Sequence, residues 1–443
     1  MFIRNSSPGS FDGRSRRYIS QCFRVARTSV DASQLPVVPD GAGISLIGTW
    51  MQQVAMAWLL YRITGSASLL GVFGFLSQVP SLFLSPFAGV FADRWNRHRA
   101  AHRNAVSRHA AGGAAAGHCH GGEIAGGPFM ILGLFLGIVN AFDMPIRQSF
   151  VVEMVPHREH LSNAIALNST IVNGARLVGP SLAGVIIAAW GERACFLLNA
   201  LSYVAVLWAL FAMRDLPRRD RYPEGHILRH LKDGFAYAFG FPPLRILLGM
   251  LAIISFCAMS VSVLMPVFAK DILHGDANTQ GLLMGASGFG ALMAALYLAA
   301  RKSVLGLGRV IVISTACLGA GQILFSYSNR IWVSALVLIV TGCGMMLHMA
   351  ASNTLIQTIV QEDKRGRVMS MYSMAFLGIA PLGSLLSGSL ADLIGAPATV
   401  RISGGICLFV AACFALQLPQ MRKLVRPIYE EAGILTREMP PGS

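Results

Sequence analysis

Charged residues are scarce in this chain: they make up 13% of its 443 residues, against about a quarter in ordinary soluble domains. Hydrophobic residues make up 54%. So few charges cannot cover the surface of a water-soluble domain of this size. The composition therefore excludes a soluble globular protein and is typical of a chain whose main solvent is lipid.

Four signals of other protein classes are also missing. The eight cysteines lack paired metal-ligand spacing and mostly lie in apolar runs, so neither a disulfide framework nor a metal site is expected from them. Residues 1–42 contain no apolar core of a cleavable signal peptide. No G-x-x-x-x-G-K-[ST] loop is present to bind ATP, and the cytoplasmic loops show no catalytic set. We expect neither an enzyme nor a cofactor.

Apolar runs long enough to cross a bilayer recur along the chain. A helix needs roughly 20 residues to cross about 30 Å of hydrocarbon. The hydropathy pattern predicts eleven spans: Ile44–Ile63, Leu69–Phe91, Phe129–Val152, Ala164–Ala189, Ala194–Met213, Leu244–Ala269, Gly281–Ala300, Val310–Tyr327, Ile331–Ala350, Val368–Ile394 and Ile402–Leu418.

The positions of the basic residues predict the orientation of these spans. The formal net charge is +15, but on a polytopic chain basic residues usually report topology rather than nucleic-acid binding. After residue 127, alternate loops and the tail hold 17 Lys and Arg, whereas the intervening loops hold 4. We therefore expect the side with the 17 basic residues to be cytoplasmic, with both termini there, in a cell inner membrane.

An internal repeat divides the chain into two halves. A shift of 204 residues, without gaps, places Gly174, Gly179, Gly184 and Gly191 on Gly378, Gly383, Gly388 and Gly395. Two parallel bundles of six spans follow from this shift. The predicted divisions are an N-terminal segment (1–42), a first bundle (43–213), a cytoplasmic linker (214–243), a second bundle (244–418) and a tail (419–443).

The third span of the first bundle is anomalous. The shift places Ala101–Ile124 on Leu305–Ser328, which contains the span Val310–Tyr327, the ninth when this slot is counted as the third. Yet residues 101–127 contain eight Ala, seven Gly and four His, with no Leu or Phe. Arg103 and Arg108 would each cost about 2.5–3.5 kcal/mol near a helix centre. We predict a degenerate slot at residues 100–127, poorly packed as helix or loop, and hypothesise a local reading-frame slip that was later restored.

A metal site is the alternative interpretation of this segment. Six residues are potential ligands: His98, His102, His109, His118, Cys119 and His120. Their irregular spacing does not favour one face, and we expect no metal. The slot therefore remains assigned to a damaged span.

A loop after the second span resembles the signature of the major facilitator superfamily, G-x-L-A-D-R-x-G-R-R/K. In "GVFADRWNRHR" the matching residues are Gly89, Ala92, Asp93, Arg94 and Arg97. The resemblance implies a fold of two six-helix bundles in an all-α membrane protein, and a gating loop that latches the halves in the outward-facing state. The alternative is a solvated, positively charged loop.

A glycine-rich run in the fifth span resembles the antiporter motif of the same superfamily. In "NGARLVGPSLAG" the matching residues are Gly174, Gly179, Pro180 and Gly184, and Arg176 is extra. Small residues allow close helix approach, and proline bends a span. The motif is expected to form a hinge or, alternatively, an ordinary tight contact.

Few charges fall inside the spans. Asp143 and Arg147 stand at i and i+4 in the fourth span, on one face, and charges inside a bilayer usually face a cavity or each other. The pair is a proton-linked gate or cavity contact, or else a static salt bridge. Asp143 is the best proton carrier, Arg176 is a further intramembrane charge, and Glu153 is expected to meet the basic loop around Arg94.

The first two spans and the region from about Pro128 to Leu418 look like the branch that includes the enterobactin exporter and macrolide-efflux proteins. Polar and aromatic residues of these spans are candidates for a cavity wall: Trp50, Gln52, Gln53 and Gln78. The resemblance implies a secondary exporter of a small amphipathic molecule, drug or siderophore-like, driven by protons and acting as a monomer. Alternatives are an importer or lipid flippase of this fold, or a non-transporting chain.

Overall fold

The computed structural model describes residues 37–94, 106–110, 113, 126–153, 161–212, 236–301, 303–362 and 364–431, which are almost entirely helical. In the first half the helices are α2 (Val37–Thr64), α3 (Ala67–Arg94), α5 (Gly126–Glu153), α6 (Leu161–Trp190) and α7 (Glu192–Ala212). In the second half they are α9 (Pro242–Val267), α10 (Ala277–Ala300), α11 (Leu307–Tyr327), α12 (Ile331–Ile359), α13 (Arg365–Ser373), α14 (Ala380–Ile394) and α15 (Ala396–Glu431).

Each of the eleven predicted spans falls inside a single helical stretch, except that Ala194–Met213 extends one residue past the end of α7. Two of these stretches contain a π-helical turn, at Phe268–Ile272 after α9 and at Met374–Gly378 between α13 and α14. Within the described residues, seven stretches are long and apolar enough to cross a membrane. The local hydropathy signal therefore located the helices correctly.

Two boundaries differ from the prediction. α2 begins at Val37, although residues 1–42 were expected to precede the bundle. Pro39 lies in the first turn of α2, where its missing N–H would have no helical partner, so it does not prevent the earlier start. α15 continues to Glu431 through Pro419 and Pro427, well past the predicted end of the last span.

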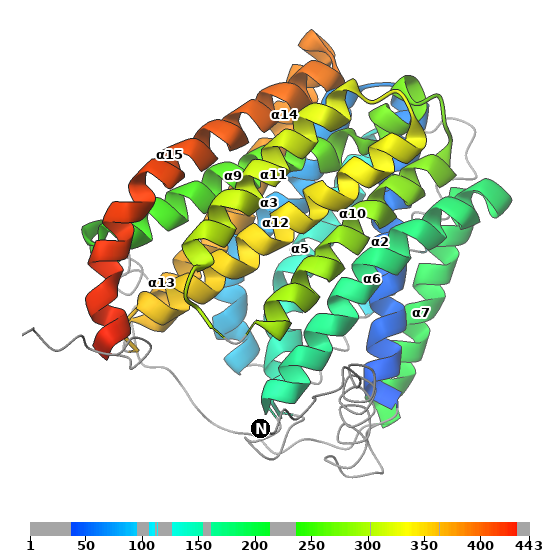
Figure 1. Ribbon diagram of the computed structural model, residues 1–443. Helices are drawn as coiled ribbons and strands as arrows, with labels where there is room; N and C mark the ends of the chain where they lie inside the picture. The colour runs from blue at the N-terminus through cyan, green and yellow to red at the C-terminus, as the bar shows by residue number, and fades with distance from the viewer. Residues whose placement is uncertain are drawn as a thin grey trace, which may run out of the picture.

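The helices run side by side in one bundle, and α2 begins on the same side on which α15 ends (Figure 1). α6 of the first half lies against α10 of the second, and α3 lies against α14. Large apolar side chains remain exposed on the outside; Leu416 and Leu393 are each 80% exposed. An apolar exterior of this kind fits contact with lipid.

Glycines make the seam between the two halves tight. A Cβ built on Gly184 would lie 2.8 Å from the Ala277 carbonyl oxygen of α10, and one on Gly388 would lie 2.5 Å from the Ala67 carbonyl oxygen of α3. Real side chains do not tolerate such distances, so both positions require glycine for this approach. The 204-residue shift therefore superposes two glycines that make the same kind of contact in opposite directions.

Candidate functional site

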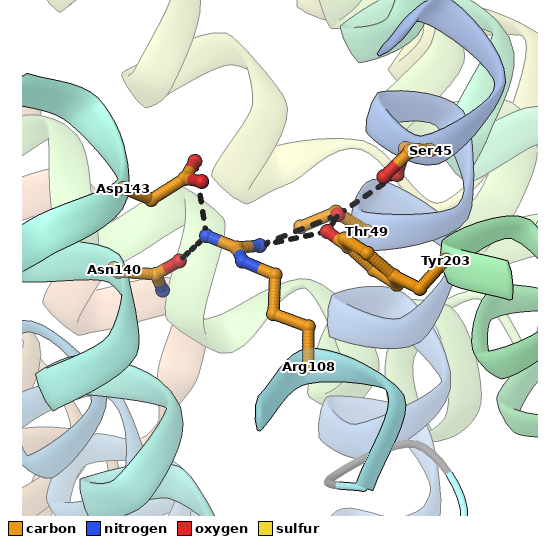
Figure 2. Close-up of polar contacts among 6 residues, drawn as sticks. All are labelled: Ser45, Thr49, Arg108, Asn140, Asp143 and Tyr203. Carbon is orange, nitrogen blue, oxygen red and sulfur yellow. Dashed lines mark hydrogen bonds and ion pairs between the residues drawn. The ribbon is translucent and has the colours of Figure 1, made fainter. Parts of the chain in front are cut away.

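A cluster of polar side chains lies inside the first half, around Arg108 (Figure 2). Arg108 belongs to the short helical segment 106–110 and is only 5% exposed. Its Nη2 atom lies 3.2 Å from Oδ2 of Asp143 and donates to the side-chain oxygen of Asn140, both on α5. The guanidinium is therefore neutralised by a carboxylate and held by an amide, the arrangement that a buried arginine requires.

The other side of the Arg108 guanidinium contacts α2 and α7. Nη1 donates to the Tyr203 hydroxyl at 3.2 Å and to the Thr49 hydroxyl at 3.4 Å. These two hydroxyls are themselves 2.8 Å apart, and Thr49 also donates to the Ser45 carbonyl oxygen at 2.9 Å. The cluster thus joins three helices of the bundle through one cation (Figure 2).

The sequence interpretation of Arg108 was wrong in one respect. It assigned Arg108 a cost of insertion into the bilayer with no group to offset that cost. In the structure four polar side chains surround the guanidinium. These partners are distant in sequence, so hydropathy of the local segment could not reveal them. The predicted degenerate third span otherwise lies mostly outside the described residues, and its origin in a frame slip stays a hypothesis.

Asp143 has its expected place inside a helix, with an additional partner. It lies in α5, ten residues from Glu153 at the helix end, and its side chain is 22% exposed. Sequence spacing paired it with Arg147, whose side chain lies outside the described part, as does that of Glu153. The partner that sequence reasoning missed is Arg108.

Arg176 and Trp50 form a second intramembrane contact. The Arg176 guanidinium carbon lies 5.7 Å from the centre of the Trp50 ring, across the α6–α2 interface. Both residues were candidates from the sequence, and the structure brings them together. Such a cation–π contact contributes about 0.5–2 kcal/mol and leaves the positive charge in place.

The glutamines proposed for a cavity wall have different surroundings. Gln52 is buried and accepts a hydrogen bond from Asn199, so it fastens α2 to α7. Gln53 is exposed. Gln78 donates to the Gly74 carbonyl oxygen at 3.1 Å and to the Ser384 hydroxyl at 3.4 Å, and the second contact crosses between the halves. The packed position of Gln52 does not favour the cavity role predicted for it.

The glycine-rich run of α6 contributes close contacts rather than one uniform groove. A Cβ on Gly179 would lie 2.5 Å from the Cβ of Trp50, whereas one on Gly174 would meet nothing within 4 Å. Pro180 is buried inside α6, and Gly184 packs on α10. Tight packing is therefore seen at Gly179 and Gly184, and the hinge role of the motif remains a prediction.

The gating motif lies at the end of α3. Gly89, Asp93 and Arg94 belong to the last turns of this helix, which ends at Arg94, and Arg97 lies outside the described residues. The latch role of these four residues thus stays a prediction.

The residues of the alternative metal site are mostly outside the described part of the chain. His109 is described, and its Nδ1 lies 2.8 Å from the Ala200 carbonyl oxygen. Among the residues with described positions, no three His, Cys, Asp or Glu side chains gather in a way that would hold a metal ion.

Comparison with known proteins agrees with the helical arrangement. The family model described as "Transmembrane secretion effector" matches residues 41–429. The solved structure of the nucleoside transporter NupG aligns with a TM-score of 0.66 at 15% identity, over 85% of this chain and 98% of that one. At this identity the likeness shows the fold alone, which is that of the major facilitator superfamily.

Two curated relatives align along most of their length. The staphyloferrin A transporter of Staphylococcus aureus is 26% identical over 378 residues, covering 83% of this chain and 92% of the relative. Macrolide efflux protein A of Streptococcus pyogenes is 23% identical over 395 residues, covering 87% and 95%. With the family model spanning nearly all the described helices, the chain belongs to the transmembrane secretion effector family of the major facilitator superfamily and is a multi-pass membrane transporter rather than an enzyme.

Proposed function

We propose that this transporter exports a small amphipathic molecule in exchange for protons, and that Asp143 carries the proton. The observation on which the proposal rests is the ion pair between Asp143 and the buried Arg108. Intramembrane carboxylates are rare and usually functional. Export, as opposed to import, is supported by the family description and by the efflux named for relatives such as macrolide efflux protein A.

The geometry gives protonation of Asp143 a mechanical consequence. In its charged form the carboxylate neutralises Arg108, which also holds Tyr203 of α7 and Thr49 of α2. A proton on Asp143 removes the negative charge and weakens the attraction between α5 and this group. Proton uptake on one side of the membrane would thereby loosen α5 from α2 and α7, a change that alternating access requires.

Transport into inverted vesicles tests the proposal. With an imposed pH gradient, wild-type vesicles should accumulate at least one of three probes: a macrolide, ethidium or N-dansyl-6-aminohexanoate. Asp143→Asn should lower gradient-driven uptake at least tenfold while binding of the same probe to purified protein changes little. Glu430→Gln is the control, because it removes a carboxylate paired with Arg426 near the end of α15.

A purely structural pair predicts a different pattern. Removing one partner of a buried ion pair costs about 3–5 kcal/mol, whereas replacing both with apolar residues is close to neutral. If the pair is structural only, Arg108→Leu with Asp143→Leu should regain the stability and the transport that either single change loses. Normal gradient-driven transport by the Asp143→Asn protein would exclude the coupling role.

A further inference from the structure

Arg176 occupies the middle of α6, the helix that contains the predicted span Ala164–Ala189. It lies 15 residues after the start of α6 and 14 before its end. An arginine near a helix centre costs about 2.5–3.5 kcal/mol to insert, so it requires compensation from its surroundings. The compensation at Arg176 differs from that at Arg108.

The two intramembrane arginines have unequal partners. Arg108 has the Asp143 carboxylate 3.2 Å away, together with hydrogen bonds to three further side chains. For Arg176, the Trp50 ring is the contact that the structure shows, and within the described part of the chain no carboxylate lies within 4.0 Å of its guanidinium. An aromatic face stabilises a cation without neutralising it, so Arg176 retains its charge and its hydrogen-bond donors.

Arg176 also lies at the seam between the halves. A Cβ on Gly288 of α10 would lie 3.0 Å from the Arg176 carbonyl oxygen, so the two helices touch at this level. The side chain is half-buried and therefore not sealed inside the first bundle. Trp50, which contacts Arg176, is next in sequence to Thr49, whose hydroxyl accepts a hydrogen bond from Arg108. The unneutralised charge is thus at the same depth of α2 as the proposed proton site.

We propose that Arg176 binds the anionic group of the transported molecule, with the Trp50 ring supporting the guanidinium, and that the substrates are amphipathic carboxylates. This inference rests on the proposed export function and names its substrate class. A planar guanidinium matches a carboxylate through two parallel hydrogen bonds, which a lysine cannot reproduce. Lipid headgroups lie at the helix ends, so at mid-helix depth the anion comes from the substrate.

Fluorescence titration of the purified transporter, without any gradient, tests this site. The probes are N-dansyl-6-aminohexanoate and its amide, which share the fluorophore and the chain and differ in charge. Wild-type protein should bind the carboxylate at least tenfold more tightly than the amide. Arg176→Gln should abolish this preference while the affinity for the amide stays within twofold, and Arg176→Lys should keep only part of it.

Arg401→Gln is the matched control. The Arg401 guanidinium carbon lies 4.7 Å from the centre of the Tyr327 ring, so the change removes the same kind of contact in the second half. It should leave the preference for the carboxylate intact. Trp50→Phe keeps an aromatic face and should weaken the preference less than Arg176→Gln does.

Three results would overturn the proposal: no preference for the carboxylate in wild-type protein, an unchanged preference in Arg176→Gln, or equal weakening of both probes, which indicates a structural role. If Arg176→Gln does not fold, Arg176→Lys decides, because loss of the paired hydrogen bonds should lower carboxylate affinity alone. Since the titration is made at equilibrium, its failure would leave proton-driven export of neutral or cationic probes untouched.

Discussion

Asp392, near the end of α14, accepts backbone hydrogen bonds from Ala67 at 2.9 Å and Ser68 at 3.0 Å, at the start of α3. The hydroxyl of Ser66 donates to the same carboxylate at 3.2 Å. Because α3 belongs to the first half and α14 to the second, one half caps a helix of the other. Separation of the halves at this end therefore leaves helix N–H groups without their acceptor.

A second contact closes the same end of the bundle. The Tyr61 hydroxyl, near the end of α2, donates to Asp271 in the π-helical turn after α9. The Lys270 ammonium lies 5.5 Å from the centre of the Tyr61 ring. Through these contacts Tyr61 of the first half is a bridge to the second half.

Asp392→Ala is predicted to favour the state in which this end is open. Loss of a helix cap costs about 1 kcal/mol, equivalent to roughly a fivefold change in the equilibrium between closed and open states. Spin labels at the exposed positions 190 and 393, on a cysteine-free background, should report longer distances. Glu430→Ala, which disrupts an ion pair within α15 alone, should leave the distances unchanged. Identical distance distributions for Asp392→Ala and wild type would argue against the cap.

The seam glycines predict opposite effects of alanine at two positions of α6. Gly184→Ala places a Cβ 2.8 Å from a backbone oxygen of α10 and should destabilise the protein by about 1–3 kcal/mol. Gly174→Ala meets nothing within 4 Å and should be neutral or stabilise α6 by about 0.5–1 kcal/mol. Thermal melts followed by size-exclusion chromatography measure both. Equal melting temperatures for the two variants would contradict this assignment.

Replacing the third-span slot tests its degeneracy. A chain carrying the sequence of Val310–Tyr327 at positions 106–123 should express better than the unaltered chain, since an apolar segment enters lipid favourably. That replacement removes Arg108, so a second version retains arginine at position 108 and keeps the partner of Asp143. Equal yield from the unaltered chain would mean that the segment is native. A melting temperature of that chain that depends on zinc or nickel would then support the metal site.

The reading frame offers an independent check of the same segment. Translation of the other two frames across codons 98–127 should yield a hydrophobic run, because Ala, Gly, Arg and His are frequent products of G+C-rich DNA read out of frame. If neither frame gives such a run, the slip hypothesis fails.

Topology is predicted from the charge distribution. A cysteine at Asn278, exposed at the start of α10, should react with a membrane-impermeant maleimide added outside whole cells, whereas one at Arg219 in the linker should not. Gly191, between α6 and α7 in a loop predicted to lie on the same side, has a φ of 77°, so cysteine there would be strained. Labelling at Arg219 from outside would reverse the orientation.

The sequence by itself determined the helices and their pairing into halves. A membrane span depends on about 20 consecutive residues, so hydropathy located α5 and α12 without knowledge of their neighbours. The repeated glycines could also be recognised from the sequence alone, since Gly184 and Gly388 occupy matching places in the 204-residue repeat. In the structure they make matching contacts. The superfamily followed from the motif after the second span, because its spacing is local.

Only the tertiary structure decided which polar groups meet. Arg108 is 95 residues from Tyr203 and 59 from Thr49, and Gln52 is 147 from Asn199. No local pattern encodes such pairings, because they depend on which faces of three helices come together. For the same reason the sequence treated Arg108 and Arg176 alike, as cations in the membrane, while packing gave a carboxylate to the first and an aromatic ring to the second.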